Sequence, residues 1–400
     1  MESVIFVVHR IPFPPNKGDK IRSYQILKAL ASRYKVKLFC FVDDSADLKY
    51  EGDLNKFADK VYVEYLPKWR VLLRAAKSIF LGKSITEMVY QSNLMSQAVS
   101  SEFDQGASAV IAFSSSMGQY LPESSGVVKQ VVDFVDVDSL KWHDYAHKKP
   151  FYLTWLYRRE ADLLSKLEIR LFQEGAISTF VTNSERDLFL KMLTGSTDRV
   201  KVVGNGVDTA FFDPCIEYQS PYQALGLGVD QSICFVGAMD YYANEDAVMW
   251  FASNVLPLIL SKYPNCTFFI VGRNPSKRLQ QFARFTPGVL VTGAVSDVRP
   301  YLQYCSLVVA PLRIARGMQN KILEALSMNK HVVASSEAAQ GVDIDSTSNC
   351  LYACETKGGM AERIITLMSD KAAVCDGREQ VLKHYSWGPQ MDRLLGELET

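Results

Sequence analysis

The segment from Leu307 to Leu326 has residue types that suit the binding of an anionic ligand. An apolar run ends at Pro311, and the loop that follows carries Arg313, Arg316 and Gly317. A helical pattern comes next. A buried strand that leads through a basic, glycine-containing loop into a helix is a common way to bind phosphate.

The predicted helix after this loop carries two charged side chains. Backbone amides near Gly317 and Met318 would offer a phosphate site, strengthened by the helix dipole and by Lys321. Lys321 and Glu324 are three positions apart and therefore lie on one helix face. Glu324 would accept hydrogen bonds from ribose hydroxyls. The alternative is an ordinary surface ion pair between these two residues.

Three carboxylates gather near the end of another apolar run. Asp133 belongs to the predicted strand, whereas Asp136 and Asp138 extend beyond it. Clustered carboxylates can act as a base, bind a metal or hold substrate hydroxyls. No glycine-rich calcium loop accompanies them, and capping aspartates are an equally acceptable interpretation.

The first apolar run, Val4–Val8, leads into a proline-rich loop that ends at Gly18. Gly18 permits a close backbone approach, and Asp19 is expected to cap the next helix, whose amino terminus would attract an anion. An ordinary connecting loop is the alternative. Farther along, Ser184 with Asp187 fits a helix cap.

These residues must be positioned by the apolar, β-branched runs that recur along the chain. The predicted strands are Val4–Val8, Val36–Val42, Val61–Leu66, Ala109–Phe113, Gln130–Val135, Ile177–Thr182, Val200–Val203, Ile233–Gly237, Thr267–Gly272, Val289–Thr292, Leu307–Leu312, Val332–Ser335 and Leu351–Cys354. Helical patterns lie between most of them. Alternating strands and helices indicate an α/β protein with parallel sheets.

A turn-rich stretch, Asp213–Pro221, separates the two series of strands. We therefore predict a Rossmann-like domain over residues 1–213 and a second one over residues 222–385. Ligands of such sheets bind beyond the carboxyl ends of the strands, so two such domains would face each other across a cleft.

The composition excludes several classes of function. The 400 residues include 44 basic and 44 acidic side chains, and this balance argues against broad nucleic-acid binding. The eight cysteines form no Cys-x2-Cys pair, so we expect free, mostly buried thiols and no metal site. No apolar run reaches the roughly 20 residues of a membrane span. A cytoplasmic protein is expected.

Residues 68–83 form a basic amphipathic pattern. The segment has five basic residues and no acidic one, and Trp69, Leu72, Leu73, Ala76 and Phe80 recur at helical spacing. Such a helix can bind peripherally to an anionic membrane. A core helix with a solvated basic face would have the same pattern.

Taken together, the motifs resemble those of GT-B glycosyltransferases of the large retaining group, over nearly the whole chain. They are Pro12–Gly18, Thr182–Glu185, Asn205–Asp208, Phe235–Gly237, Gly317–Leu326 and the pair Ser386-Trp387. The stretches 133–139 and 313–325 are similar to those of sugar transferases associated with exopolysaccharide and exosortase gene sets.

The resemblance implies a nucleotide-sugar donor, UDP- or GDP-linked, in the C-terminal domain and a glycan or lipid-linked acceptor in the N-terminal domain. It implies retention at the anomeric carbon, no obligatory metal and no other cofactor. The final helix, with residues 386–400, would cross back to the first domain.

The resemblance also implies roles for single residues. Glu324 would bind the ribose, and the amides from Gly317 and Met318, with Lys321, would bind the diphosphate. The loop at Gly237 would approach the phosphates, and the backbone at Val295 would meet the nucleobase. On the acceptor side, Gly18 and Asp138 would line the site and Asp136 would act as a polar catalytic residue.

Two departures from the family pattern concern the donor. Ala238 and the Ala243-Asn244 region stand where many relatives have a basic pair, and Arg316 replaces a glutamate that contacts sugar hydroxyls. Arginine only donates hydrogen bonds, so Arg316 is expected to contact a donor phosphate or a sugar carboxylate. The alternative is that it turns outward as an ordinary solvated side chain. A nucleotide-sugar epimerase and a catalytically inactive nucleotide-sugar-binding subunit are the alternatives to a transferase.

Overall fold

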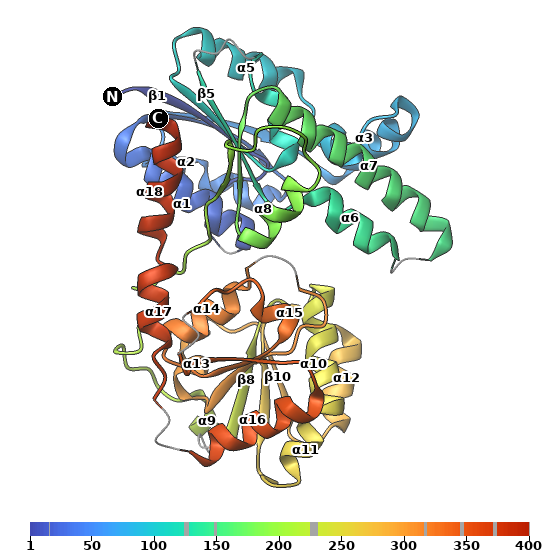
Figure 1. The fold of residues 1–400 in the computed structure, drawn as a ribbon, viewed down its shortest axis with the longest axis vertical. Coiled ribbons are helices and arrows are strands. Elements are labelled where there is room, and N and C mark those ends of the chain that lie inside the picture. The colour runs from blue at the N-terminus through green and yellow to red at the C-terminus, as the bar shows by residue number, and fades with distance from the viewer. Residues whose placement is uncertain are drawn as a thin grey trace. The chain divides into compact units, whose positions relative to one another are not determined.

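The computed structural model of the protein describes residues 1–15, 17–123, 128–147, 150–224, 231–315, 318–344, 348–370 and 374–399. The chain divides into two compact units. Unit 1 comprises Met1–Gly204 with Gln390–Thr400, and unit 2 comprises Asn205–Pro389. Each unit is a parallel sheet with helices on its faces (Figure 1).

Unit 1 contains a seven-stranded sheet in the order β3-β2-β1-β4-β5-β6-β7. Its strands are β1 (Ser3–Val8), β2 (Lys35–Val42), β3 (Lys60–Tyr65), β4 (Ala109–Phe113), β5 (Lys129–Val135), β6 (Ile177–Phe180) and β7 (Val200–Val202). Its helices are α1 (Gly18–Arg33), η1 (Ser45–Tyr50), α2 (Glu51–Leu54), α3 (Lys68–Leu81), α4 (Ile85–Val89), α5 (Asn93–Asp104), η2 (Ser115–Tyr120), α6 (Asp138–His147), α7 (Phe151–Gln173) and α8 (Asn183–Leu190).

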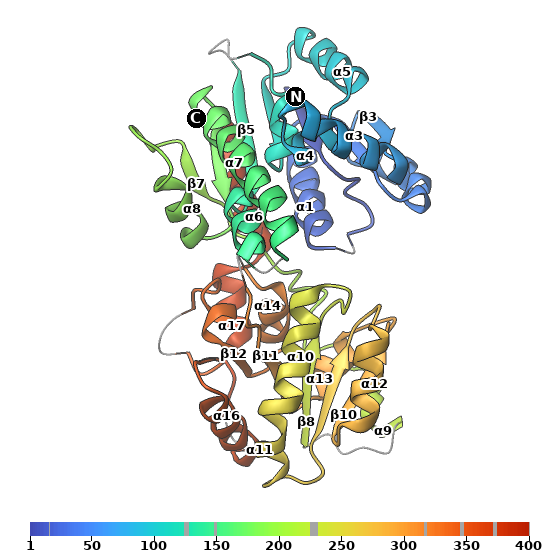
Figure 2. The ribbon, with the colours of Figure 1, turned by 90° about the vertical axis from the view of Figure 1, so that its right-hand side faces the viewer.

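Unit 2 contains a six-stranded sheet in the order β10-β9-β8-β11-β12-β13. Its strands are β8 (Ser232–Val236), β9 (Thr267–Val271), β10 (Val289–Gly293), β11 (Leu307–Ala310), β12 (Val332–Ser335) and β13 (Leu351–Cys354). Its helices are α9 (Pro221–Ala224), α10 (Tyr242–Asn254), α11 (Leu256–Leu260), α12 (Lys277–Phe285), α13 (Arg299–Tyr304), α14 (Asn320–Ser327), α15 (Ser336–Ala339), α16 (Lys357–Ser369) and α17 (Gly377–His384). Figure 2 shows α10, α11 and α16 along this sheet.

The predicted α/β fold class is confirmed, since each of the thirteen predicted strands has a counterpart in one of the two sheets. The central strands are apolar on both faces because helices cover both sides, and all five residues of β4 are buried. Among the described residues, no helix combines the length and apolar character that a bilayer span requires. All eight cysteines are free, and five of them are buried.

The turn-rich stretch between the two series of strands lies within unit 2, beyond the division at Gly204. Its backbone is held by Gln303 of α13, whose side-chain amide donates to the carbonyl oxygens of Pro214 and Ile216 and accepts from the amide of Tyr218. Residues 213–221 are therefore fastened to unit 2.

The last helix, α18 (Trp387–Glu399), begins in unit 2 and from Gln390 onward belongs to unit 1. The Gln390 side chain accepts a hydrogen bond of 2.8 Å from the amide of Gly204. Arg33 of α1 forms ion pairs with Asp392 and Glu399. Helix α18 thus packs against α1, although the two helices lie at opposite ends of the sequence.

The core of unit 1 contains a fully buried ion pair between α1 and β5. Arg22 donates from Nε to Asp133 Oδ2 at 2.7 Å and from Nη2 to Oδ1 at 3.0 Å. Its guanidinium also donates to the carbonyl oxygens of Val203 and Gly204, and Thr179 donates to Asp133. Asp133 therefore holds the fold together and is not a free carboxylate of the aspartate cluster.

Replacing Arg22 with methionine should lower the free energy of unfolding by about 3–5 kcal/mol, because a buried carboxylate is then left without its partner. Urea denaturation followed by circular dichroism measures this loss. The matched control is Arg186→Met at the exposed Arg186–Asp187 pair, which should cost at most about 1 kcal/mol. Equal losses in the two variants would contradict the role given to Arg22.

Candidate functional site

The strand order of unit 2 changes direction between β8 and β11, which is where a parallel sheet of this kind binds its ligands. After β8 the chain proceeds to β9 and β10 on one side, whereas β11 begins the series on the other side. Connections that diverge from neighbouring strands leave a ligand-binding crevice between them. Gly237 and Asn244 follow β8, and Met318, Lys321 and Glu324 follow β11.

The loop after β8 is tightly packed. The amide of Gly237 donates to the carbonyl of Val271, and a Cβ atom at Gly272 would lie only 1.7 Å from the Gly237 oxygen. A Cβ at Gly237 itself would come within 2.8 Å of Asn244 Nδ2. Both glycines are therefore required by close packing, and this packing fixes the backbone at the edge of the crevice.

Asn244 connects the two loops. It is buried, donates to the Ala238 carbonyl at 2.9 Å, and accepts a hydrogen bond of 2.7 Å from Lys321 Nζ. The ammonium group also lies 4.9 Å from the centre of the Phe235 ring. Asn244 therefore holds the Lys321 amine in one position at the crevice, although it carries no charge itself.

Lys321 and Glu324 influence each other's ionisation. Burial lowers the pKa of Lys321 to about 8, although the nearby Glu324 carboxylate opposes this shift. Burial raises the pKa of Glu324 to about 7, and Lys321 opposes that shift as well. Each group is therefore poised near neutral pH, where a bound anion would favour the charged form of the lysine.

The amino terminus of α14 lies next to these groups. Among the described residues, the N-cap Gln319 makes no side-chain capping bond, and the preceding Met318 is half-buried. Of the predicted phosphate-binding residues, Arg316 and Gly317 lie outside the described residues. Arg313 forms an ion pair with Asp246 of α10.

Val295 lies apart from this group. It follows β10, the edge strand, which is separated from β8 by β9. Nearby, Asp297 pairs with Arg299, whose guanidinium stacks 3.7 Å from the centre of the Phe211 ring. The predicted contact of Val295 with a nucleobase stays a prediction.

In unit 1 the chain connections diverge in the same way between the neighbouring strands β1 and β4. Gly18 begins α1, and Lys17, not Asp19, is the N-cap residue. Asp19 instead lies 2.5 Å from Arg10 and 3.4 Å from Nε2 of His9. Burial alone would raise the pKa of Asp19, but His9 and Arg10 hold it well below its usual value.

The aspartates after β5 are also paired. Asp136 contacts Lys141 at 2.5 Å, and Asp138 accepts from Ser115 at 3.0 Å and lies 3.7 Å from Lys141. Burial opposes the charge on Lys141, but the two carboxylates raise its pKa above the ordinary value. The cluster is thus a mixed one, in which a lysine neutralises much of the negative charge.

Sequence reasoning did not identify several residues of these regions. In the sequence, Asn244 stands out only as part of a region that lacks the basic pair of the family pattern, and not as a residue that positions Lys321. His9 stacks on Phe113, and within the described part of the chain its buried Nδ1 has no hydrogen-bond partner. A histidine directly after the first strand could have drawn attention.

Glu168 was also overlooked. It accepts from the Ser139 amide and hydroxyl, and burial raises its pKa to about 8. It lies inside α7, where the helical pattern gives no signal of such a contact.

The cap of α8 differs from the predicted one. Thr182, and not Ser184, is the N-cap residue, and its side chain accepts from the Glu185 amide at 3.1 Å. The strand before this helix ends at Phe180, two residues earlier than expected, so the helix also begins earlier.

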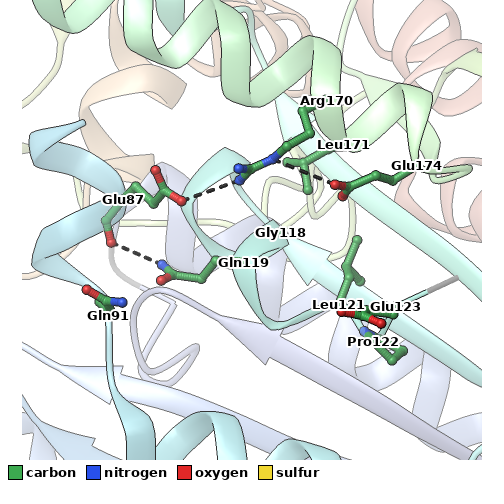
Figure 3. A pocket seen from close by; sticks show the side chains of 10 residues that line it. All are labelled: Glu87, Gln91, Gly118, Gln119, Leu121, Pro122, Glu123, Arg170, Leu171 and Glu174. Atoms are coloured by element: carbon green, nitrogen blue, oxygen red, sulfur yellow. Dashed lines mark hydrogen bonds and ion pairs between the residues drawn. The ribbon is translucent and has the colours of Figure 1, made fainter. Parts of the chain in front are cut away.

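Unit 1 also has an open pocket of about 580 Å³, lined by Glu87, Gln91, Gly118, Gln119, Leu121, Pro122, Glu123, Arg170, Leu171 and Glu174 (Figure 3). Pro122 accepts a hydrogen bond from Gln130 at the start of β5, and Arg170 and Glu174 precede β6. The pocket therefore lies at the edge where strands begin, away from the residues at the strand ends.

Comparison with known proteins assigns a family to part of the chain. Residues 230–370 match the family described as glycosyl transferases group 1. No curated protein matches the sequence. The matched range contains β8 to β13 together with Asn244, Lys321 and Glu324.

Several solved structures share the fold over the full chain at low sequence identity. Sucrose-phosphate synthase from Thermosynechococcus elongatus is 13% identical, with a TM-score of 0.68 over 99% of this chain and 98% of that chain. HepE from Anabaena, in complex with UDP and glucose, is 14% identical, with a TM-score of 0.68 over 100% of both chains.

WaaG, a glycosyltransferase involved in lipopolysaccharide biosynthesis, is 15% identical, with a TM-score of 0.64 over 98% of both chains. These likenesses establish the two-domain α/β fold. Residues 230–370 thus match the glycosyl transferases group 1 family within a chain of the GT-B fold, and together the findings support a glycosyltransferase.

Proposed function

We propose that this protein is a retaining glycosyltransferase that transfers a sugar from a nucleoside diphosphate to a glycan or lipid-linked acceptor in cell-surface polysaccharide synthesis. The observation that carries the proposal is the cluster of Asn244, Lys321 and Glu324 at the carboxyl ends of β8 and β11. It joins a positioned cation and a carboxylate at the crevice of the group 1 domain.

The donor would lie with its diphosphate near Lys321 and the first amides of α14, where the helix dipole adds to the attraction. Glu324 would accept hydrogen bonds from the ribose hydroxyls, and the packed backbone at Gly237 would approach the phosphates. HepE has been solved with UDP-glucose, so a uridine nucleotide is the first donor to test before a guanosine one.

The chemical step follows from the charge that develops on the leaving group. The acceptor hydroxyl oxygen forms a bond to the anomeric carbon while the bond from that carbon to the phosphate oxygen breaks, and the nucleoside diphosphate leaves with the bonding electrons. A phosphate oxygen takes the hydroxyl proton. Lys321 and the helix amides stabilise the growing charge, and attack from the leaving-group face retains the anomeric configuration.

On the acceptor side we propose the strand-end residues of unit 1. Gly18 leaves space at the start of α1, where a Cβ atom would contact nothing within 4 Å. Asp136 and Asp138 hold Lys141 between them, so an acceptor hydroxyl would meet both donors and acceptors of hydrogen bonds. Such mixed polarity suits a sugar hydroxyl better than it suits an anion.

Replacing Glu324 with alanine should weaken the use of the nucleotide sugar by about 1.5–3 kcal/mol, roughly 10- to 150-fold, because a charged hydrogen bond is lost. Calorimetric binding of UDP-glucose and GDP-mannose, followed by transfer assays, measures the effect. Glu362→Ala, on exposed α16 surface of the same unit, is the control and should retain wild-type binding. Unchanged affinity in Glu324→Ala would refute the ribose contact, and binding without transfer or hydrolysis in the wild type would indicate an inactive subunit.

Donor affinity should fall as pH rises through about 8, because Lys321 then loses the proton that attracts the diphosphate. A nucleotide sugar has no phosphate group that titrates there, and Glu324, whose pKa burial raises to about 7, is already mostly ionised at pH 8, so Lys321 is the main group of this pair that changes charge above that pH. Lys321→Arg should flatten the profile, since arginine stays charged. Calorimetry between about pH 7 and pH 9.5 tests this, and a flat wild-type profile would contradict a phosphate contact by Lys321.

A further inference from the structure

Helix α3 of unit 1 turns its apolar side away from the protein. Val71, Ala75 and Ser78, on one face, pack against the unit or are buried. At 100° per residue, the opposite face carries Trp69, Leu72, Leu73, Ala76 and Phe80, which we call the α3 stripe. In an ordinary surface helix this face would be polar.

The α3 stripe is exposed to an unusual extent. The exposed fractions are 58% for Trp69, 71% for Leu72, 62% for Leu73 and 89% for Phe80. Single exposed apolar side chains are common, but a continuous stripe on one helix marks an interaction surface. The core-helix interpretation of residues 68–83 is therefore wrong, because the unit leaves these side chains uncovered.

Basic side chains border the α3 stripe. Lys68, Arg70, Lys77 and Lys83 are exposed, and no acidic residue occurs between positions 68 and 83. The Arg70 guanidinium lies 5.3 Å from the centre of the Trp69 ring. The fifth basic residue, Arg74, points inward and donates to the Val89 carbonyl at 2.7 Å.

The helix is held firmly in this orientation. Arg159 of α7 donates from Nη2 to the carbonyl oxygens of Ser78 and Lys83, at the carboxyl end of α3. Trp155, which is 61% exposed, lies one turn earlier on α7. Trp155 is four positions before Arg159 and therefore lies on the same face of α7. Figure 2 shows α3 at the margin of unit 1.

We propose that the α3 stripe docks unit 1 on an anionic lipid membrane. An apolar face bordered by lysine and arginine buries itself at the boundary between headgroups and acyl chains while its charges bind anionic headgroups. A second copy of the chain is a poorer occupant, because two such helices would bring like charges together. The proposal depends on unit 1 alone and not on sugar transfer.

Flotation of the full-length protein with phosphatidylcholine vesicles, with and without phosphatidylglycerol, tests the proposal in the absence of any substrate. The wild type should float with the anionic vesicles at low salt and be released by added salt. Arg70→Gln with Lys77→Gln should lower binding by roughly 30-fold at most, from about 1 kcal/mol per charge. Phe80→Ser should lower it about tenfold by removing buried apolar area.

The matched control is Leu94→Ser, because Leu94 in α5 of unit 1 is 66% exposed but that helix carries no basic residue. This variant should float like the wild type, and circular dichroism should show all variants folded. Absence of the wild type from anionic vesicles at low salt would overturn the proposal, as would equal binding by Phe80→Ser. A dimer that Phe80→Ser dissociates, seen by light scattering, would overturn it in favour of a second copy.

Discussion

The buried contact between Arg22 and Asp133 is the interaction on which the arrangement of unit 1 depends. The guanidinium of Arg22, on α1, donates hydrogen bonds to the carboxylate of Asp133 on β5. It also donates to the carbonyl oxygens of Val203 and Gly204. Both charges are removed from water, so their mutual bonds, with those to the two carbonyl oxygens and to Thr179, must offset the cost of burial. The helix that begins at Gly18 is thereby fixed relative to the strand that leads to Asp136 and Asp138.

Unit 2 uses buried polarity differently. Lys321 and Glu324 are neither fully neutralised nor fully solvated, and their ionisation is shifted in opposite directions by the same burial. A neutral amide, Asn244, holds the amine in place. A bound anion can therefore change the charge of Lys321, whereas the charges of Arg22 and Asp133 are already paired with each other.

The sequence predicts the strands well because a strand buried on both faces must be apolar along its whole length, as Ala109–Phe113 shows. It also places Lys321 and Glu324 on one helix face. It cannot predict Asn244, whose importance arises from a contact across 77 positions of sequence. The cap at Thr182 shows the usual uncertainty at helix ends, where several hydroxyl-bearing residues compete.

The orientation of α3 shows a deeper limit. Helical periodicity reveals that Trp69, Leu72 and Phe80 share a face, but it does not reveal whether the protein covers that face. Asp133 presents the same difficulty, since a carboxylate at a strand end has the same pattern whether it faces solvent or a buried arginine. Both outcomes depend on tertiary neighbours that local spacing does not encode.

The proposed docking of the α3 stripe on a membrane would have a consequence for encounter kinetics. A protein held on a lipid surface meets a lipid-linked acceptor by a search in two dimensions, and the acceptor's density on that surface replaces its bulk concentration. Confinement raises the effective concentration of the two partners without any new contact between them. An acceptor site of modest intrinsic affinity could then suffice, and a water-soluble acceptor fragment would lose this advantage whatever sugar it carries.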